Sequence, residues 1–214
     1  MHKVLGNSYN EVVGSSLADT IKKYRQGATI LFELPVENYF FANTVSLKYL
    51  TNSDYKGVYI SFQRPFKNIY DLFEKHEINN DRVLILDCSN CEKTKSNEEN
   101  NSVNISSFNI DDFGNKIVKA LKSLKCKNKF IYIDSLTTVA LYKNTSEIKR
   151  LTKILTDIIN NKDFENVLIV LNVAEDLSKK KFVRDISNYA DEVVNVLECD
   201  KRYSRNILES TVCT

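Results

Sequence analysis

Short runs of consecutive apolar residues most constrain the fold of this chain. Each run is rich in β-branched and aromatic side chains and is bounded by charged or turn-forming residues. A strand that is apolar on both faces has to be covered on both, as in a parallel sheet between two layers of helices. The runs predict strands at residues 28–34, 57–62, 82–87, 130–133, 166–172 and 192–197.

The segments between these runs predict helices, because their apolar residues recur at intervals of three or four. Asn144 and Glu147 have the spacing of a capping box, which predicts a helix start. Pro65 predicts another, and the expected buried stripe of that helix is Phe66, Ile69, Tyr70 and Phe73. Alternating strands and helices predict an α/β fold, a three-layer sandwich with a mostly parallel central sheet flanked by helices. We expect one domain over residues 1–214.

Composition excludes several functional classes. A net charge of +2 and a pI near 8.1 are too mild to predict an obligate nucleic-acid or membrane partner. No apolar run has the length of a membrane span, and residues 1–10 lack the apolar segment of a signal peptide. The five cysteines, an odd number without framework spacing, indicate reduced thiols. We therefore expect a cytoplasmic protein.

One segment departs from the general composition. Residues 88–109 are rich in Asn, Ser, Glu and Lys. This predicts a mobile surface loop within the domain.

Asp134 and Ser135 end the apolar run at residues 130–133, where open α/β sheets keep their ligands. Two interpretations of Asp134 are open. A carboxylate at a strand end can hold Mg²⁺, which prefers oxygen ligands. Alternatively, Asp134 caps the helix that follows.

Taken in order, four segments resemble the RecA-like ATPase domain of the KaiC/RadA family. They are GATILFEL at 27–34, GVYISF at 57–62, FIYIDSLT at 130–137 and ISNYADEVVNVLE at 186–198. The likeness extends from about residue 15 to residue 208, with Arg205 in an expected late strand. It implies a P-loop NTPase fold, a site for ATP and Mg²⁺, and assembly side by side into rings or filaments.

The phosphate loop of that family departs from its pattern here. A G-x-x-x-x-G-K-[ST] motif should lie between Leu34 and Ala42, where the chain reads LPVENYFFA. Glycine, lysine and the magnesium-binding Ser or Thr are all missing, and an acid has been added. A close charge pair is worth about 4 kcal/mol, so the loss of the attractive lysine and the gain of the repulsive Glu37 both weaken triphosphate binding. The degenerate P-loop comprises Pro35, Val36, Glu37, Asn38, Tyr39, Phe40 and Phe41, of which the three aromatic residues are interpreted as packed helix residues.

A second departure concerns the water-activating glutamate, which the resemblance places near Gln63 or Arg64. Neither residue can act as a carboxylate base. Arg64 either binds an anion or makes only surface contacts. We therefore predict no catalytic residue in this chain.

Cysteine and lysine motifs give weaker signals. Cys88 and Cys91 form a C-x-x-C pair, which is half of a zinc site. A metal or redox switch is the weaker interpretation of this pair, and coincidence is the preferred one. His2 and His76 offer no ligand pair. Lys179–Lys181 with Arg184 reads as a solvated basic face.

These observations predict a noncatalytic KaiC/RecA-like domain that acts as a regulatory or scaffolding protein. Its expected partner is a protein, in a homo-oligomer or in a hetero-oligomer with an active KaiC/RecA-like ATPase, and no cofactor is expected. The alternative is an ATP-binding domain with an atypical phosphate loop, in which ATP and Mg²⁺ meet Asp134, Ser135, Arg64 and Gln63.

Overall fold

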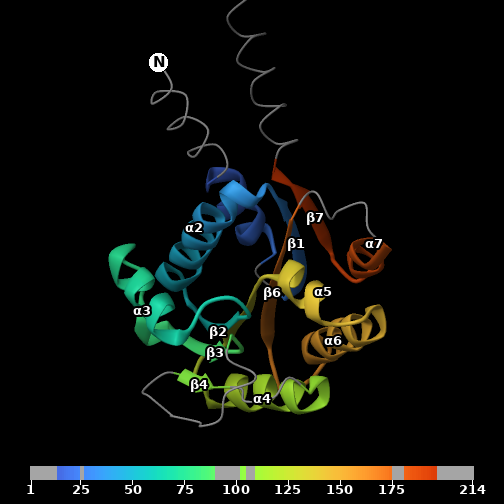
Figure 1. Ribbon diagram of the computed structural model, residues 1–214. Coiled ribbons are helices and arrows are strands. Elements are labelled where there is room, and N and C mark those ends of the chain that lie inside the picture. Colours follow the sequence, from blue (N-terminus) through green and yellow to red (C-terminus); the bar gives the residue numbers. More distant parts are fainter. Residues whose placement is uncertain (1–13, 25–26, 90–101, 105–108, 175–180, 197–214) are drawn as a thin grey trace, which may run out of the picture.

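Seven parallel strands form one sheet in the computed structural model of the protein (Figure 1). The structure describes residues 14–24, 27–89, 102–104, 109–174 and 181–196. The strand order is β4-β3-β2-β5-β6-β1-β7, which places β5 at the centre. The strands are β1 (Ala28–Leu34), β2 (Tyr55–Ser61), β3 (Val83–Asp87), β4 (Ser102–Asn104), β5 (Asn128–Asp134), β6 (Asn166–Ala174) and β7 (Glu192–Asn195).

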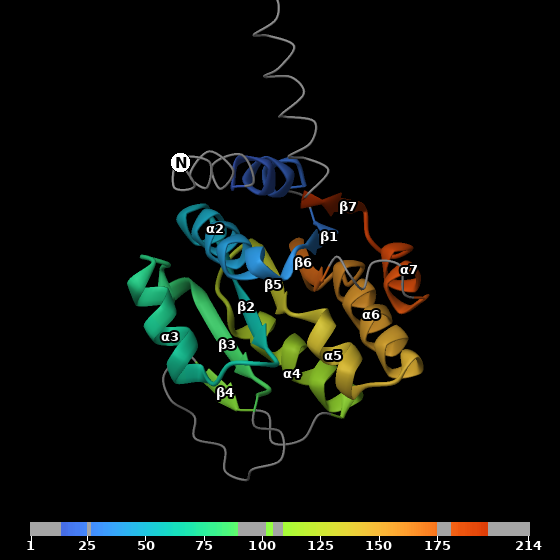
Figure 2. The ribbon, with the colours of Figure 1, turned by 45° about the horizontal axis from the view of Figure 1, so that its top comes forward.

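Helices cover both faces of this sheet (Figures 1 and 2). Helical residues 14–23, α2 (Tyr39–Asn52) and α3 (Phe66–Lys75) pack on one face. The opposite face carries α4 (Ile110–Ser123), α5 (Leu136–Tyr142), α6 (Thr145–Ile159) and α7 (Lys181–Ser187). Two short 3-10 helices, η1 (Val36–Asn38) and η2 (Asn80–Arg82), lie in connections. The predicted three-layer α/β sandwich is confirmed.

The alternation of side chains along β5 explains why its apolar run is continuous. Phe130 and Tyr132 enter the core beneath α2 and α3, whereas Ile131 and Ile133 enter the core beneath α4 to α7. All four side chains are fully buried. Successive side chains of a strand point to opposite faces, so two cores require apolar residues at every position.

Two local features differ from the sequence-based predictions. Residues 102–104 form the edge strand β4, in which Val103 pairs with Leu86, although the prediction placed only a loop there. Tyr70 is exposed rather than part of a buried stripe, because α3 turns only Ile69 and Phe73 fully into the core. The Tyr70 ring lies instead against Phe66.

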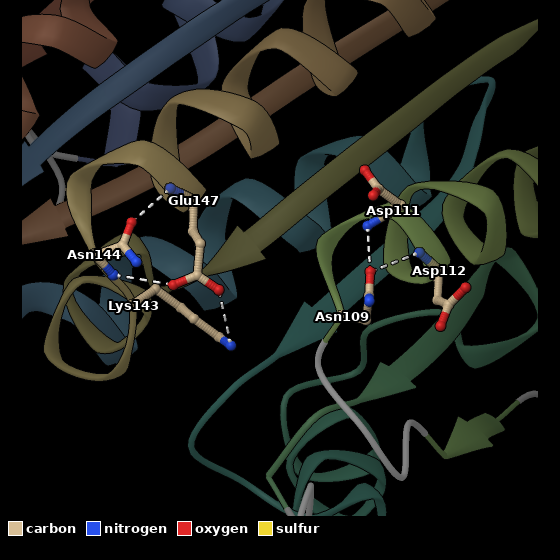
Figure 3. Close-up of polar contacts among 6 residues, drawn as sticks. All are labelled: Asn109, Asp111, Asp112, Lys143, Asn144 and Glu147. Carbon is tan, nitrogen blue, oxygen red and sulfur yellow. Dashed lines mark hydrogen bonds and ion pairs between the residues drawn. The ribbon is translucent and has the colours of Figure 1, made fainter.

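Side-chain caps fix the starts of two helices (Figure 3). Asn144 accepts a hydrogen bond from the Glu147 N–H at 3.0 Å, and the Glu147 carboxylate accepts one from the Asn144 N–H at 3.2 Å. The predicted capping box is therefore confirmed. The Asn144 N–H bond and the nearby Lys143 ammonium both lower the pKa of Glu147. At the start of α4, Asn109 accepts from the backbone of Asp111 at 2.9 Å.

None of the helices among the described residues has the length and apolar content needed to cross a bilayer.

Gly57 on β2 lies directly opposite Phe130 on β5. A Cβ at Gly57 would lie 2.3 Å from the Phe130 ring. We expect Gly57→Ala to lower the free energy of unfolding by about 1–3 kcal/mol, the usual cost of overpacking a core. Urea denaturation measures this loss.

Gly14→Ala is the matched control, because the added Cβ would meet its nearest neighbour at an ordinary 3.5 Å. It should stay within about 1 kcal/mol of the wild type. Equal stability of the two variants would contradict the close approach of β2 and β5.

Candidate functional site

The candidate site lies where the parallel strands β1, β2, β5 and β6 end. Their carboxyl ends share one edge of the sheet, which is the usual ligand site of open α/β folds. Three connections meet there: β1 to α2, β2 to α3, and β5 to α5. Figure 2 shows α5 beside the connection from β2 to α3.

The β1–α2 connection is closed by its own backbone. Pro35 leads into η1, where the Asn38 N–H donates to the Pro35 carbonyl at 2.9 Å and the Tyr39 N–H donates to the Val36 carbonyl. A phosphate-binding loop needs successive N–H groups that point into an open concavity. In this connection, two of those groups are already bonded within the turn. The placement of the Glu37 side chain lies outside the described residues.

Tyr39 joins this connection to α5. Its hydroxyl makes a 2.9 Å hydrogen bond with Thr137 Oγ1. Thr137 Oγ1 also accepts the backbone N–H of Ala174, the last residue of β6, at 2.8 Å. The Tyr39 ring therefore bridges from the start of α2 to α5 and to the end of β6.

Phe40 and Phe41, like Tyr39, are half-buried. The Phe40 ring meets His76 edge to face at 5.1 Å between centroids, and the Arg64 guanidinium lies 5.7 Å from its centroid on the ring face. Phe41 packs against the core beneath α2 and would contact a Cβ added at Gly14. These aromatic side chains therefore pack against the domain.

Asp134 is turned into the protein. Only 5% of the residue is exposed, and its Oδ2 accepts a 2.5 Å hydrogen bond from the Tyr59 hydroxyl. Ser135, joined to it by a cis peptide bond, caps α5 by accepting the Thr138 N–H at 3.4 Å. The interpretation of Asp134 as the helix cap is therefore wrong, because the next residue has that role.

Burial raises the pKa of Tyr59 well above its usual value, and the negative charge of Asp134 raises it further. Tyr59 therefore keeps its proton and remains a donor to the carboxylate at neutral pH. Its ring stacks on Tyr132, whose hydroxyl donates to Asn43 Oδ1 at 2.9 Å. Asn172 donates to the same Oδ1 at 2.6 Å. A buried polar layer thus connects the sheet with α2.

Gln63 and Arg64 lie in the β2–α3 connection, as expected. The exposed Gln63 donates from its amide to Thr138 Oγ1. Ser61 Oγ holds the backbone of Arg64 by donating to its carbonyl at 2.9 Å and accepting its N–H at 3.1 Å. Thr138 Oγ1 also lies 3.3 Å from Ser135 Oγ, within hydrogen-bond distance. The Thr138 hydroxyl therefore links Gln63 to Ser135.

Sequence reasoning missed Asp87 and Thr137. Asp87 ends β3, is buried, and accepts the Phe66 N–H at 2.8 Å and the Ser89 N–H at 2.9 Å. It therefore anchors the start of α3. The sequence did carry a signal for Asp87, because β3, like β5, is an apolar run that ends in Asp. Thr137 carried no signal of its own.

The cysteine and basic motifs are only partly described. Cys88 is buried, whereas Cys91 lies outside the described residues, as do His2, Arg205 and the lysines at 179 and 180. Within the described ranges, no group of three or more metal-ligating side chains occurs.

No protein-family model and no curated protein matches this sequence. Solved structures do resemble it. An uncharacterized protein, PH0321 from Pyrococcus horikoshii, in complex with an unknown peptide, has a TM-score of 0.58 and 13% identity, with 84% of this chain and 81% of that chain covered. The KaiC-like protein PH0186 from Pyrococcus horikoshii OT3 has a TM-score of 0.53 and 19% sequence identity, with 78% of this chain and 71% of that chain covered.

A third solved structure, an ATPase domain, gives a TM-score of 0.50 and 12% identity, covering 79% of this chain and 68% of that chain. At these identities the likeness concerns the fold. The chain has the three-layer α/β fold of RecA-like ATPase domains.

The Asp134–Tyr59 bond can be tested by stability. Tyr59→Phe removes the hydroxyl and leaves a buried carboxylate without its donor, so the free energy of unfolding should fall by about 1–3 kcal/mol. Chemical denaturation at pH 7 measures the change.

Tyr189→Phe, at an exposed tyrosine, serves as the control and should change stability by less than about 0.5 kcal/mol. Equal stability of Tyr59→Phe and wild type would show that Asp134 does not depend on this donor.

Proposed function

We propose that this chain is a noncatalytic RecA-like domain that works as a regulatory or scaffolding protein through protein–protein contacts. One observation carries the proposal. The connection that would enclose a triphosphate uses its own N–H groups internally, and the Tyr39 side chain ties it to Thr137.

Phosphate binding would require several of these bonds to break. The N–H groups of Asn38 and Tyr39 are engaged in the turn, and no lysine lies between Leu34 and Ala42 to neutralise the phosphates. Each internal hydrogen bond contributes about 0.5–1.5 kcal/mol net, which a ligand would have to offset before gaining affinity. The connection between β1 and α2 is therefore better suited to stay closed by these bonds than to bind a nucleotide.

The magnesium role of Asp134 meets a similar obstacle. Its Oδ2 is already bonded to Tyr59, and the residue is almost fully buried. To bind Oδ2, a metal ion would have to displace the hydroxyl of Tyr59, which is itself buried. A scaffolding role needs no such rearrangement.

Two observations support contact with other polypeptides. Val36 and Leu141 are 65% and 74% exposed, although both are large apolar residues, Val36 in η1 just after β1 and Leu141 in α5. In addition, PH0321, a protein of similar fold, was solved in complex with an unknown peptide. The proposed partner of this chain is a protein, either a second copy or an active KaiC/RecA-like ATPase.

The alternative, ATP binding through an atypical loop, rests on Arg64. Its cationic side chain lies against Phe40 at the strand ends, where it could meet a phosphate. That alternative would also require the Tyr39–Thr137 and Tyr59–Asp134 bonds to open, so we favour the noncatalytic function.

Direct ligand measurements separate the two functions. Isothermal titration of the purified protein with ATP and MgCl2 should show no saturable binding at micromolar concentrations, and phosphate release should equal that of buffer. The physical reason is the missing neutralising charge together with the occupied backbone donors.

Micromolar affinity with turnover would contradict the proposal, provided that the activity belongs to this protein. Asp134→Asn should abolish such turnover, whereas Asp157→Asn, at an exposed aspartate on α6, should leave it unchanged.

A further inference from the structure

We define the Arg64 face by five residues from neighbouring elements at the strand ends: Val36, Phe40, Gln63, Arg64 and Leu141. Described contacts join its parts: Arg64 lies over Phe40, and Gln63 bonds to Thr138 on α5. The bond between Tyr39 and Thr137 links η1 and α2 to the same helix.

Val36 and Leu141 are the two highly exposed apolar residues of the Arg64 face. Val36 precedes Tyr39 by one turn, and Leu141 follows Thr137 by four residues on the same side of α5. Both side chains are more than half exposed, at 65% and 74%. The other large apolar side chains exposed among the described residues, Tyr70, Tyr189 and Val193, belong to α3, the turn after α7, and β7.

Arg64 carries the charge of the face. Its guanidinium lies on the face of the Phe40 ring, and no described carboxylate forms an ion pair with it. A half-buried arginine held against an aromatic ring has lost part of its hydration and much of its rotational freedom. It is therefore prepared to accept a carboxylate.

We propose that the Arg64 face binds a peptide segment of a partner protein that carries an Asp or Glu beside apolar residues. The carboxylate pairs with the Arg64 guanidinium, and the apolar side chains cover Val36 and Leu141. This inference rests on the proposed protein-binding function and specifies the chemistry of the partner.

A carboxylate suits this site better than a polyphosphate. The planar guanidinium can form two parallel hydrogen bonds with one carboxylate. A triphosphate would also need further cations and free N–H groups, and the neighbouring turn has bonded its own N–H groups. The exposed apolar residues on either side would gain nothing from a phosphate but would be buried by a peptide.

A random peptide library displayed on phage and selected against the purified protein tests the proposal. We expect enriched sequences to contain Asp or Glu next to apolar residues. An enriched peptide, synthesised with a fluorescent label, then gives a dissociation constant by polarisation. Arg64→Gln should weaken this binding by about 10- to 100-fold, the usual effect of losing a charge-assisted bond.

Matched variants separate this face from general effects. Leu141→Ser should weaken binding about 3- to 10-fold, since a single exposed apolar contact is lost. Arg184→Gln on α7 and Val193→Ser on β7 remove an exposed arginine and an exposed valine elsewhere, and both should bind as the wild type does. Leu141 is highly exposed, so Leu141→Ser should leave the fold intact. This variant therefore tests peptide binding at the Arg64 face even where Arg64→Gln unfolds.

Several outcomes would overturn the inference. They are the absence of enriched peptides, enrichment of basic peptides, and equal affinity of wild type, Arg64→Gln and Leu141→Ser. Self-association that Arg64→Gln abolishes in sedimentation experiments would instead identify a second copy as the occupant. Micromolar ATP binding together with turnover would refute the proposed function itself, a result separate from any of these.

Discussion

Hydrogen bonds within the connection between β1 and α2 determine what the end of β1 can bind. Asn38 and Tyr39 use their N–H groups inside the turn, and the Tyr39 hydroxyl is bonded to Thr137. Backbone N–H groups that donate to carbonyls of their own turn are not free to donate to a ligand. At the end of β1, these two N–H groups are therefore bonded within the chain.

The buried polar layer beneath α2 complements this closure. Asp134 Oδ2 accepts a hydrogen bond from the Tyr59 hydroxyl, and Asn43 Oδ1 accepts one from the Tyr132 hydroxyl, so these four side chains have partners within the domain. Buried polar groups that lose a partner cost stability, which favours retention of such a layer even without catalysis. The carboxylate at the end of β5 thus has a structural partner in Tyr59.

The layered architecture could be predicted from sequence because continuous apolar runs and helical periods are local signals. The site could be predicted only in part. Asp134 marked the correct strand end, but its partner Tyr59 is 75 residues distant in the chain and reads as an ordinary strand residue. Polar pairs of this kind depend on the sheet order, which places β2 beside β5. Strand β4 was missed because three residues within a polar segment carry no period.

A crystal structure grown with magnesium and a non-hydrolysable ATP analogue at millimolar concentration tests the closed connection most directly. We predict an unoccupied strand edge with the Tyr39–Thr137 hydrogen bond intact. Electron density for phosphates enclosed by residues 35–41, with Tyr39 displaced from Thr137, would show that this connection opens to bind nucleotide and would contradict the prediction.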